Sequence, residues 1–66
     1  MGENSRFMTP REVEQKYGIA RQTLANWRAA GRGPAYIKVS RRKVLYPVSE
    51  LNKWLIERMV IPGRVA

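Results

Sequence analysis

Apolar residues recur at helical spacing near the start of the chain. Within residues 10–17, Val13 and Tyr17 lie four positions apart, which places both side chains on one face of a helix. Thr9 precedes this segment, and Glu12 lies three positions after Thr9. The two residues form the Thr-x-x-Glu capping box of a helix start. A proline at the first helical position fits the same start. The pattern therefore predicts a helix over residues 10–17.

A second apolar stripe begins a few residues later. Gly18 can take the left-handed conformation that ends a helix, and Leu24 and Trp27 then share one face of the next segment. We expect this second helix to begin near Arg21 and to be stopped by Gly31. Two short helices separated by a tight turn are typical of a helix-turn-helix.

The following segment alternates as a β-strand does. In residues 36–40, Ile37 and Val39 share one face and Lys38 takes the other, and residues 44–46 can form the returning strand. The connection contains neither glycine nor asparagine, so a loop of three or four residues is expected instead of a two-residue primed turn. The two strands would form a wing with a basic tip.

A third helix is predicted over roughly residues 50–59, with Ser49 as its N-cap. The domain would span residues 7–59, between a flexible N-terminus (residues 1–6) and a flexible C-terminal tail (residues 60–66). The predicted core consists of Phe7, Val13, Tyr17, Ile19, Leu24, Trp27, Ile37, Val39, Leu51, Trp54 and Leu55. The chain is thus mainly α with a small β-hairpin. The order helix, helix, wing, helix is that of a winged helix-turn-helix.

Composition narrows the classes of function. The 66 residues allow one small domain, and 13 Lys and Arg against 5 Asp and Glu give a net charge of +8, so a polyanion is the expected partner. The sequence has no cysteine and no histidine and shows no catalytic triad or phosphate-binding loop, so neither an enzyme nor a metal or other cofactor is expected. No apolar run approaches the ~20 residues of a membrane-spanning helix. A membrane surface is also a polyanion, so charge alone does not decide between DNA and a membrane, while the absence of cysteine fits a cytoplasmic protein.

The outward face of the second predicted helix carries the candidate base contacts. Gln22 and Asn26 lie one turn apart there, and either amide could form a bidentate pair with adenine or be an ordinary surface amide. Arg21 and Thr23 lie at the helix start and are expected to contact phosphate. Thr23 could also touch a thymine methyl group or be a half-buried helix residue. Arg28 could bind DNA, although its position nearer the apolar side slightly favours an ion pair with Glu12 or Glu14.

The wing carries the strongest candidate site. Three consecutive cations at a hairpin tip repel one another unless an anion binds between them. One arginine could enter a narrow minor groove, whose negative potential is high, and Lys38 would add a phosphate contact. A merely solvated turn is the alternative. The candidate wing residues are Lys38, Ser40, Arg41, Arg42 and Lys43.

The sequence resembles the excisionase family, a branch of the MerR-like superfamily of winged helix-turn-helix proteins. The similar stretches are MTPREVEQKYGIARQTLANWRAAGRGPAYIKV and RRKVLYPVSELNKWL, which cover about residues 7–58. The specific features are T-P-x-E-V, Y-G-I, R-Q-T-L-x-x-W, a wing led by proline, and S-E-L-x-x-W-L. Ala20 departs from the Ser or Thr that often precedes the second helix, and Ser40 departs from the glycine often found at the wing bend.

This resemblance implies a recombination directionality factor of a phage or mobile element, acting in the bacterial host cytoplasm. Such proteins bind repeated double-stranded DNA sites near an attachment site, with neighbouring copies placed head-to-tail. They bend the DNA and direct a tyrosine integrase toward excision. The resemblance equally admits a small transcriptional regulator of the same fold. A domain that associates with membranes or RNA through charge alone is a third hypothesis.

Overall fold

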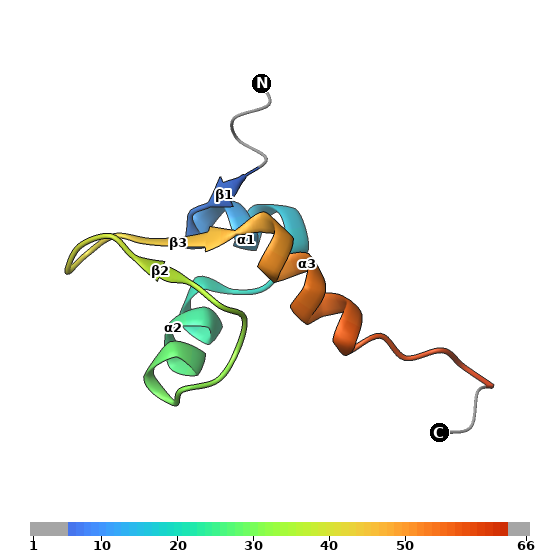
Figure 1. The fold of residues 1–66 in the computed structure, drawn as a ribbon. Helices are drawn as coiled ribbons and strands as arrows, with labels where there is room; N and C mark the ends of the chain where they lie inside the picture. The colour runs from blue at the N-terminus through green and yellow to red at the C-terminus, as the bar shows by residue number, and fades with distance from the viewer. Residues whose placement is uncertain (1–5, 64–66) are drawn as a thin grey trace.

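The computed structural model describes residues 6–63. Along the chain the elements are β1 (Phe7–Met8), α1 (Pro10–Tyr17), α2 (Arg21–Ala29), β2 (Ile37–Lys38), β3 (Val44–Pro47) and α3 (Val48–Glu57) (Figure 1). The strands form an antiparallel sheet in the order β1-β3-β2. The predicted winged helix-turn-helix is therefore confirmed.

The ends of the chain were predicted to be flexible. Residues 1–5, which are most of the predicted flexible N-terminus, and residues 64–66 of the predicted tail lie outside the described residues. Of the tail, residues 60–63 follow α3 without forming a helix or strand.

Helix α1 begins and ends as its sequence predicts. The Glu12 N–H donates to Thr9 Oγ1 at 3.1 Å, and the Thr9 N–H donates to Glu12 Oε1 at 2.9 Å, which completes the capping box. Gly18 ends the helix with φ 75°, a left-handed conformation that glycine adopts without steric penalty. Because both ends are set by local side-chain chemistry, the predicted bounds are confirmed.

Helix α3 corrects the predicted N-cap. The helix begins at Val48, with Pro47 as the residue before it, so the prediction of Ser49 as N-cap was wrong. The Val48 N–H donates to the Arg6 carbonyl oxygen at 2.9 Å. The backbone preceding β1 thus satisfies one of the N–H groups at the helix start that have no partner within the helix. Helix α3 also ends at Glu57, two residues before the predicted end.

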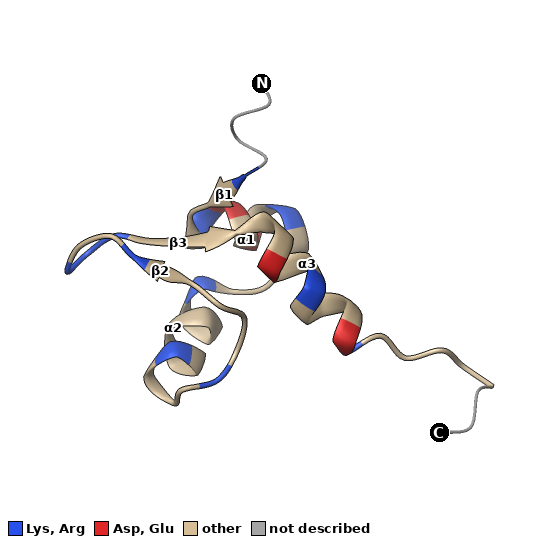
Figure 2. Cartoon of the chain, viewed as in Figure 1, with Lys and Arg blue, Asp and Glu red and all other residues tan. Residues whose placement is uncertain are grey.

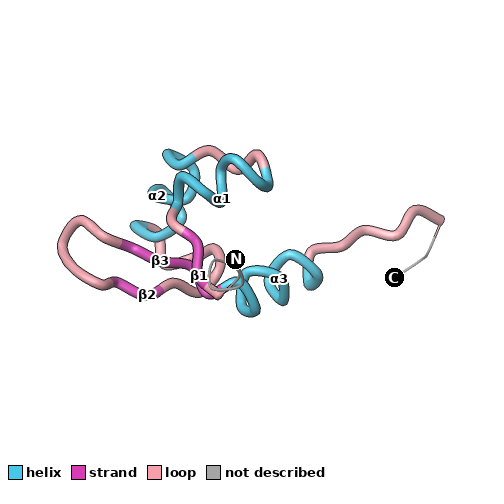
Figure 3. Tube along the Cα trace, turned by 90° about the horizontal axis from the view of Figure 1, so that it is seen from above, coloured by secondary structure: helices cyan, strands magenta, loops and turns pink. Residues whose placement is uncertain are grey.

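The sheet contains one strand that the sequence pattern did not predict. Strand β1 has two residues, too few to show alternation, and it pairs Met8 with Tyr46 and Phe7 with Pro47 on β3. On its other side β3 pairs Leu45 with Ile37. Strand β3 is therefore the central strand. Seen from above, the hairpin of β2 and β3 and helix α3 extend in opposite directions (Figure 3).

The core lies between one face of this sheet and the helices. Its buried residues are Met8, Val13, Leu24, Tyr46 and Leu51, and Trp27 packs against them with its ring centroid 5.2 Å from that of Trp54. The prediction that Phe7, Ile37 and Val39 are core residues was wrong, since they are 42%, 42% and 53% exposed.

The register of the hairpin explains the exposure of Ile37 and Val39. Ile37 lies opposite Leu45, and Lys38 lies opposite Val44. Directly opposed residues share a face, so Ile37 lies on the opposite face of the hairpin from buried Tyr46, whereas Lys38 shares the face of Tyr46 and stays exposed. Tyr46, absent from the predicted core, is 1% exposed.

Candidate nucleic-acid interface

The wing tip is a short turn of exposed polar residues. The Val39 N–H donates to the Lys43 carbonyl oxygen at 2.8 Å, and the Lys43 N–H donates to the Ser40 carbonyl oxygen at 3.3 Å. Ser40, Arg41 and Arg42 thus form a three-residue loop, which agrees with the expected length of three or four residues. Within residues 6–63 no residue other than glycine has a positive φ, as expected in the absence of a primed turn. The five candidate wing residues all have exposed side chains, namely Lys38, Ser40, Arg41, Arg42 and Lys43.

Charge is divided between two parts of the molecule. Between Gly18 and Pro47 the sequence has no acidic residue, and its cations are Arg21, Arg28, Arg32, Lys38, Arg41, Arg42 and Lys43. Among the described residues, the acidic side chains lie on α1 and α3 (Figure 2). Helix α2 and the wing are therefore the strongly positive part of the fold, and Lys38 lies there exposed on β2.

The outward face of α2 presents a pair of amides. The Gln22 Nε2 group donates to Asn26 Oδ1 at 3.0 Å, and both residues are exposed. This bond leaves the Gln22 side-chain carbonyl as an acceptor and the Asn26 amide nitrogen as a donor, each with no other hydrogen-bond partner among residues 6–63. An adenine edge in the major groove offers the complementary donor and acceptor.

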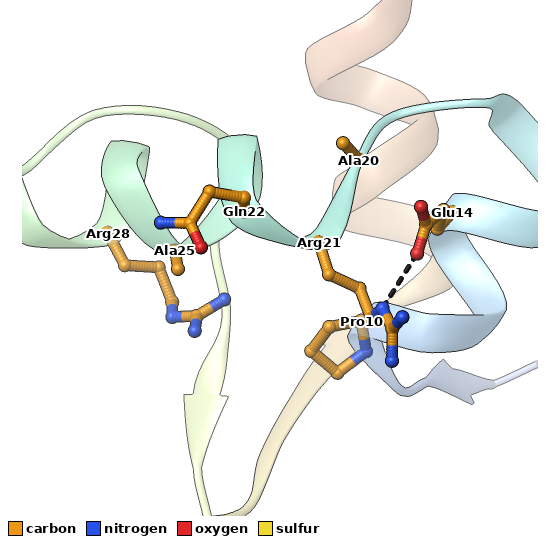
Figure 4. Close-up of a pocket in the computed structure, with 7 residues that line it drawn as sticks. All are labelled: Pro10, Glu14, Ala20, Arg21, Gln22, Ala25 and Arg28. Carbon is orange, nitrogen blue, oxygen red and sulfur yellow. Dashed lines mark hydrogen bonds and ion pairs between the residues drawn. The ribbon is translucent and has the colours of Figure 1, made fainter.

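The start of α2 is joined to α1 by an ion pair. The Arg21 Nε donates to Glu14 Oε1 at 2.7 Å (Figure 4). The prediction that Arg28 pairs with Glu12 or Glu14 was wrong, because Arg21 is the residue that reaches Glu14. Thr23 is half-buried in α2, which was one of the two alternatives considered for this residue.

Arg28 instead contacts the base of the wing. Its Nη1 donates to the Tyr46 hydroxyl at 2.7 Å, and its guanidinium lies 5.7 Å from the centroid of the Tyr36 ring. Tyr36 and Tyr46 were not predicted as site residues. The only sequence signal was their placement at the two ends of the hairpin, and that placement did not show which ring faces α2.

A groove runs between α2 and the beginning of α1. It has a volume of about 530 Å³ and is lined by Pro10, Glu14, Ala20, Arg21, Gln22, Ala25 and Arg28 (Figure 4). Because Ala20 and Ala25 have short side chains, a nucleic-acid backbone or base edge can approach α2 closely there. The groove joins three of the candidate DNA-binding residues, namely Arg21, Gln22 and Arg28. The wing residues line no part of it.

The chain belongs to the helix-turn-helix domain family, whose sequence profile matches residues 7–59. This family includes excisionase-like DNA-binding proteins. Membership supports binding of double-stranded DNA. No curated protein and no solved structure matches the chain. Within the described residues, no helix is long and apolar enough to cross a membrane.

Proposed function

We propose that the protein binds specific double-stranded DNA sites with α2 in the major groove and the wing at the adjacent minor groove or backbone. The observation that carries this proposal is the division of charge. The stretch from Gly18 to Pro47 has seven cations and no acidic residue, and it folds into α2 and the wing. Arginine and lysine side chains on such a surface replace the counterions of DNA phosphates. The exposed amides Gln22 and Asn26 would read bases.

We further propose that it is an excisionase. Bound to repeated sites beside an attachment site, neighbouring copies would lie head-to-tail, bend the DNA and direct a tyrosine integrase toward excision. Two observations support this role: the motifs shared with excisionases cover most of the chain, and the helix-turn-helix family to which it belongs includes excisionase-like proteins. A head-to-tail array uses two different surfaces of each copy and can grow along the DNA.

The direct test is a gel-shift titration on DNA that contains the attachment site, combined with circularly permuted probes that report bending. An excisionase should give stepwise complexes whose mobility depends strongly on the position of the site. Arg42→Ala should weaken every step, since each copy uses its own wing. Arg11→Ala, an exposed cation on α1, is the matched control and should leave the titration nearly unchanged.

A small transcriptional regulator of the same fold is the second candidate function, because membership of a helix-turn-helix family supports DNA binding without indicating recombination. One salt-sensitive complex without bending would contradict the excisionase and favour the regulator. Binding without any sequence preference would contradict both and leave a binder that acts through charge alone.

A further inference from the structure

Arg28, Tyr36 and Tyr46 form a cluster between α2 and the base of the wing. Arg28 Nη1 donates to the Tyr46 hydroxyl at 2.7 Å, and the guanidinium lies 5.7 Å from the Tyr36 ring centroid. The two tyrosine rings are 6.2 Å apart at an interplanar angle of 52°. Arg28 lies on α2, Tyr36 lies in the loop directly before β2, and Tyr46 lies on β3.

The cluster holds Arg28 in one place. Its guanidinium is half-buried and makes no ion pair within residues 6–63, so its hydrogen bond to Tyr46 and its position near the Tyr36 ring are its described polar contacts. A hydrogen bond from a charged donor is short and strong, and a planar guanidinium over an aromatic ring has a preferred orientation. Tyr46 is itself 1% exposed and anchored in the core. The contact therefore joins two elements whose positions are already well defined.

The cluster lies between the two parts of the proposed DNA interface. Arg28 is two residues beyond Asn26 on α2, and Tyr46 is three residues beyond Lys43 at the wing tip. Tyr36 directly precedes β2. A shift of the wing relative to α2 would change the distance between the amide pair and the basic tip, and the same shift would break the bond between Arg28 and Tyr46.

We propose that Arg28 is a positioning residue that fixes the separation of the α2 amides and the wing, so that the protein accepts a single spacing between its major-groove contact and its wing contact on DNA. This inference rests on the proposed binding of specific double-stranded DNA. It assigns a specificity role to a residue that need not touch a base.

The spacing can be measured by selecting sites from a library of random duplex DNA. The wild-type protein should select sites in which two preferred blocks of sequence are separated by one constant number of base pairs. Tyr46→Phe removes a single hydroxyl while keeping the buried ring, and Arg28→Lys keeps the charge while losing the planar group. Both variants should select sites with more than one spacing.

The same variants should lose discrimination in direct binding assays. The binding assays compare a selected site with a copy in which one base pair is inserted between the two blocks. The wild type should bind the selected site about tenfold or more tightly, which is comparable to the loss of affinity caused by a mismatched base pair. Tyr46→Phe should reduce that preference to about twofold, with affinity for random DNA unchanged. Tyr17→Phe is the matched control, because it removes a tyrosine hydroxyl that binds Asn52 away from the wing.

A merely structural role for Arg28 gives a different result. If Tyr46→Phe and Arg28→Lys lower the melting temperature but still select one spacing when folded, the positioning role is wrong. If Tyr17→Phe relaxes the spacing as much as Tyr46→Phe does, it is also wrong. Failure of the wild type to select any sequence would instead contradict the proposed function itself, so the two failures are distinguishable.

Discussion

Gln22 and Asn26 influence each other through the hydrogen bond that joins their side chains. Because Gln22 donates to Asn26, the orientation of each amide is set before DNA is bound. A contact made by a pre-oriented side chain loses less conformational entropy on binding. The two amides can therefore act together on one base pair, with Gln22 as acceptor and Asn26 as donor.

Asn26→Ala tests this pairing. The substitution removes the proposed donor and frees Gln22, so discrimination at one base pair should fall by about 1–3 kcal/mol, while affinity for random DNA stays nearly the same. Competition binding with each base pair of the site replaced in turn measures the change. Gln15→Ala removes an exposed amide from α1 and serves as the control. A uniform loss of affinity on all sequences would contradict base reading by Asn26.

At this scale, the sequence predicted which residue types lie on which face of α2 but not their partners. The 100° rotation per residue places Gln22 and Asn26 together, and the structure shows them hydrogen-bonded. The same rule could not decide whether Arg21 or Arg28 reaches Glu14. That choice depends on the crossing of α1 and α2, which is set by packing between helices and not by either sequence alone.

At the scale of the elements, the two helices of the helix-turn-helix begin differently. Thr9 caps α1 with its hydroxyl, whereas Ala20 has the extended backbone of an N-cap, with φ −60° and ψ 142°, and no side-chain hydrogen bond. The first N–H groups of α2 therefore lack the bond that a Ser or Thr would provide. Ala20 is also the residue at which the chain departs from the pattern common in excisionases.

Ala20→Ser should stabilise the fold because its hydroxyl can accept a bond from α2. We expect a gain of about 0.5–2 kcal/mol in the free energy of unfolding, measured by urea denaturation. Thr9→Ala is the reciprocal variant and should lose a similar amount. If Ala20→Ser leaves the stability unchanged while Thr9→Ala lowers it, the start of α2 is satisfied by some group other than an N-cap side chain.

The loop after α2 depends on Gly33, which has φ 97°. A Cβ atom added there would lie 2.9 Å from the Cβ of Trp27, and neither atom can move without shifting the backbone. Gly18 also has a positive φ, but a Cβ there would meet no atom within 4 Å. Gly33 therefore permits both an unusual backbone conformation and a close approach to α2.

Gly33→Ala and Gly18→Ala separate these two effects. Gly18→Ala should cost only the backbone strain, about 1–2 kcal/mol. Gly33→Ala should be worse by at least about 1 kcal/mol, because overpacking against Trp27 is added. Thermal denaturation of both variants measures the difference. Equal losses would show that the loop can move away from Trp27 freely.

Elements with local signals were the ones that the sequence predicted well. Helix α1 has a capping box at one end and a glycine at the other, and its bounds are confirmed. Strand β1 has two residues and exists because β3 lies beside it, so no local pattern could reveal it. The predicted start of α3 was wrong for a related reason. The first N–H of this helix donates to the backbone carbonyl of Arg6, which lies far away in the sequence.

The whole molecule combines a small core with a charged surface on one part of the fold. The wing extends beyond the core, so its strands have no second layer to cover their outer face (Figure 1). Ile37 and Val39 alternate as buried residues would, yet they are exposed there. Periodicity identified the strands but could not show which face of the hairpin would meet the helices.

Salt dependence tests the charge division directly. If α2 and the wing neutralise about 4–7 phosphates, the logarithm of the DNA association constant should fall against the logarithm of salt concentration with a slope of between about −4 and −6. Arg42→Ala should make this slope less steep by about one, whereas Arg11→Ala on α1 should not change it. Fluorescence anisotropy over a range of salt concentrations gives both slopes. A slope near zero would rule out phosphate contacts as the main source of affinity.

The placement of α2 and the wing in adjacent grooves can be tested most directly by methylation interference on a selected site. Dimethyl sulfate modifies guanine in the major groove and adenine in the minor groove, so one experiment reports on both. We expect interference at major-groove guanines in one block and, where the wing enters the minor groove, at adenines in the neighbouring block, with Arg42→Ala losing only the second. Interference in the minor groove alone, or a loss of both blocks in Arg42→Ala, would contradict this placement.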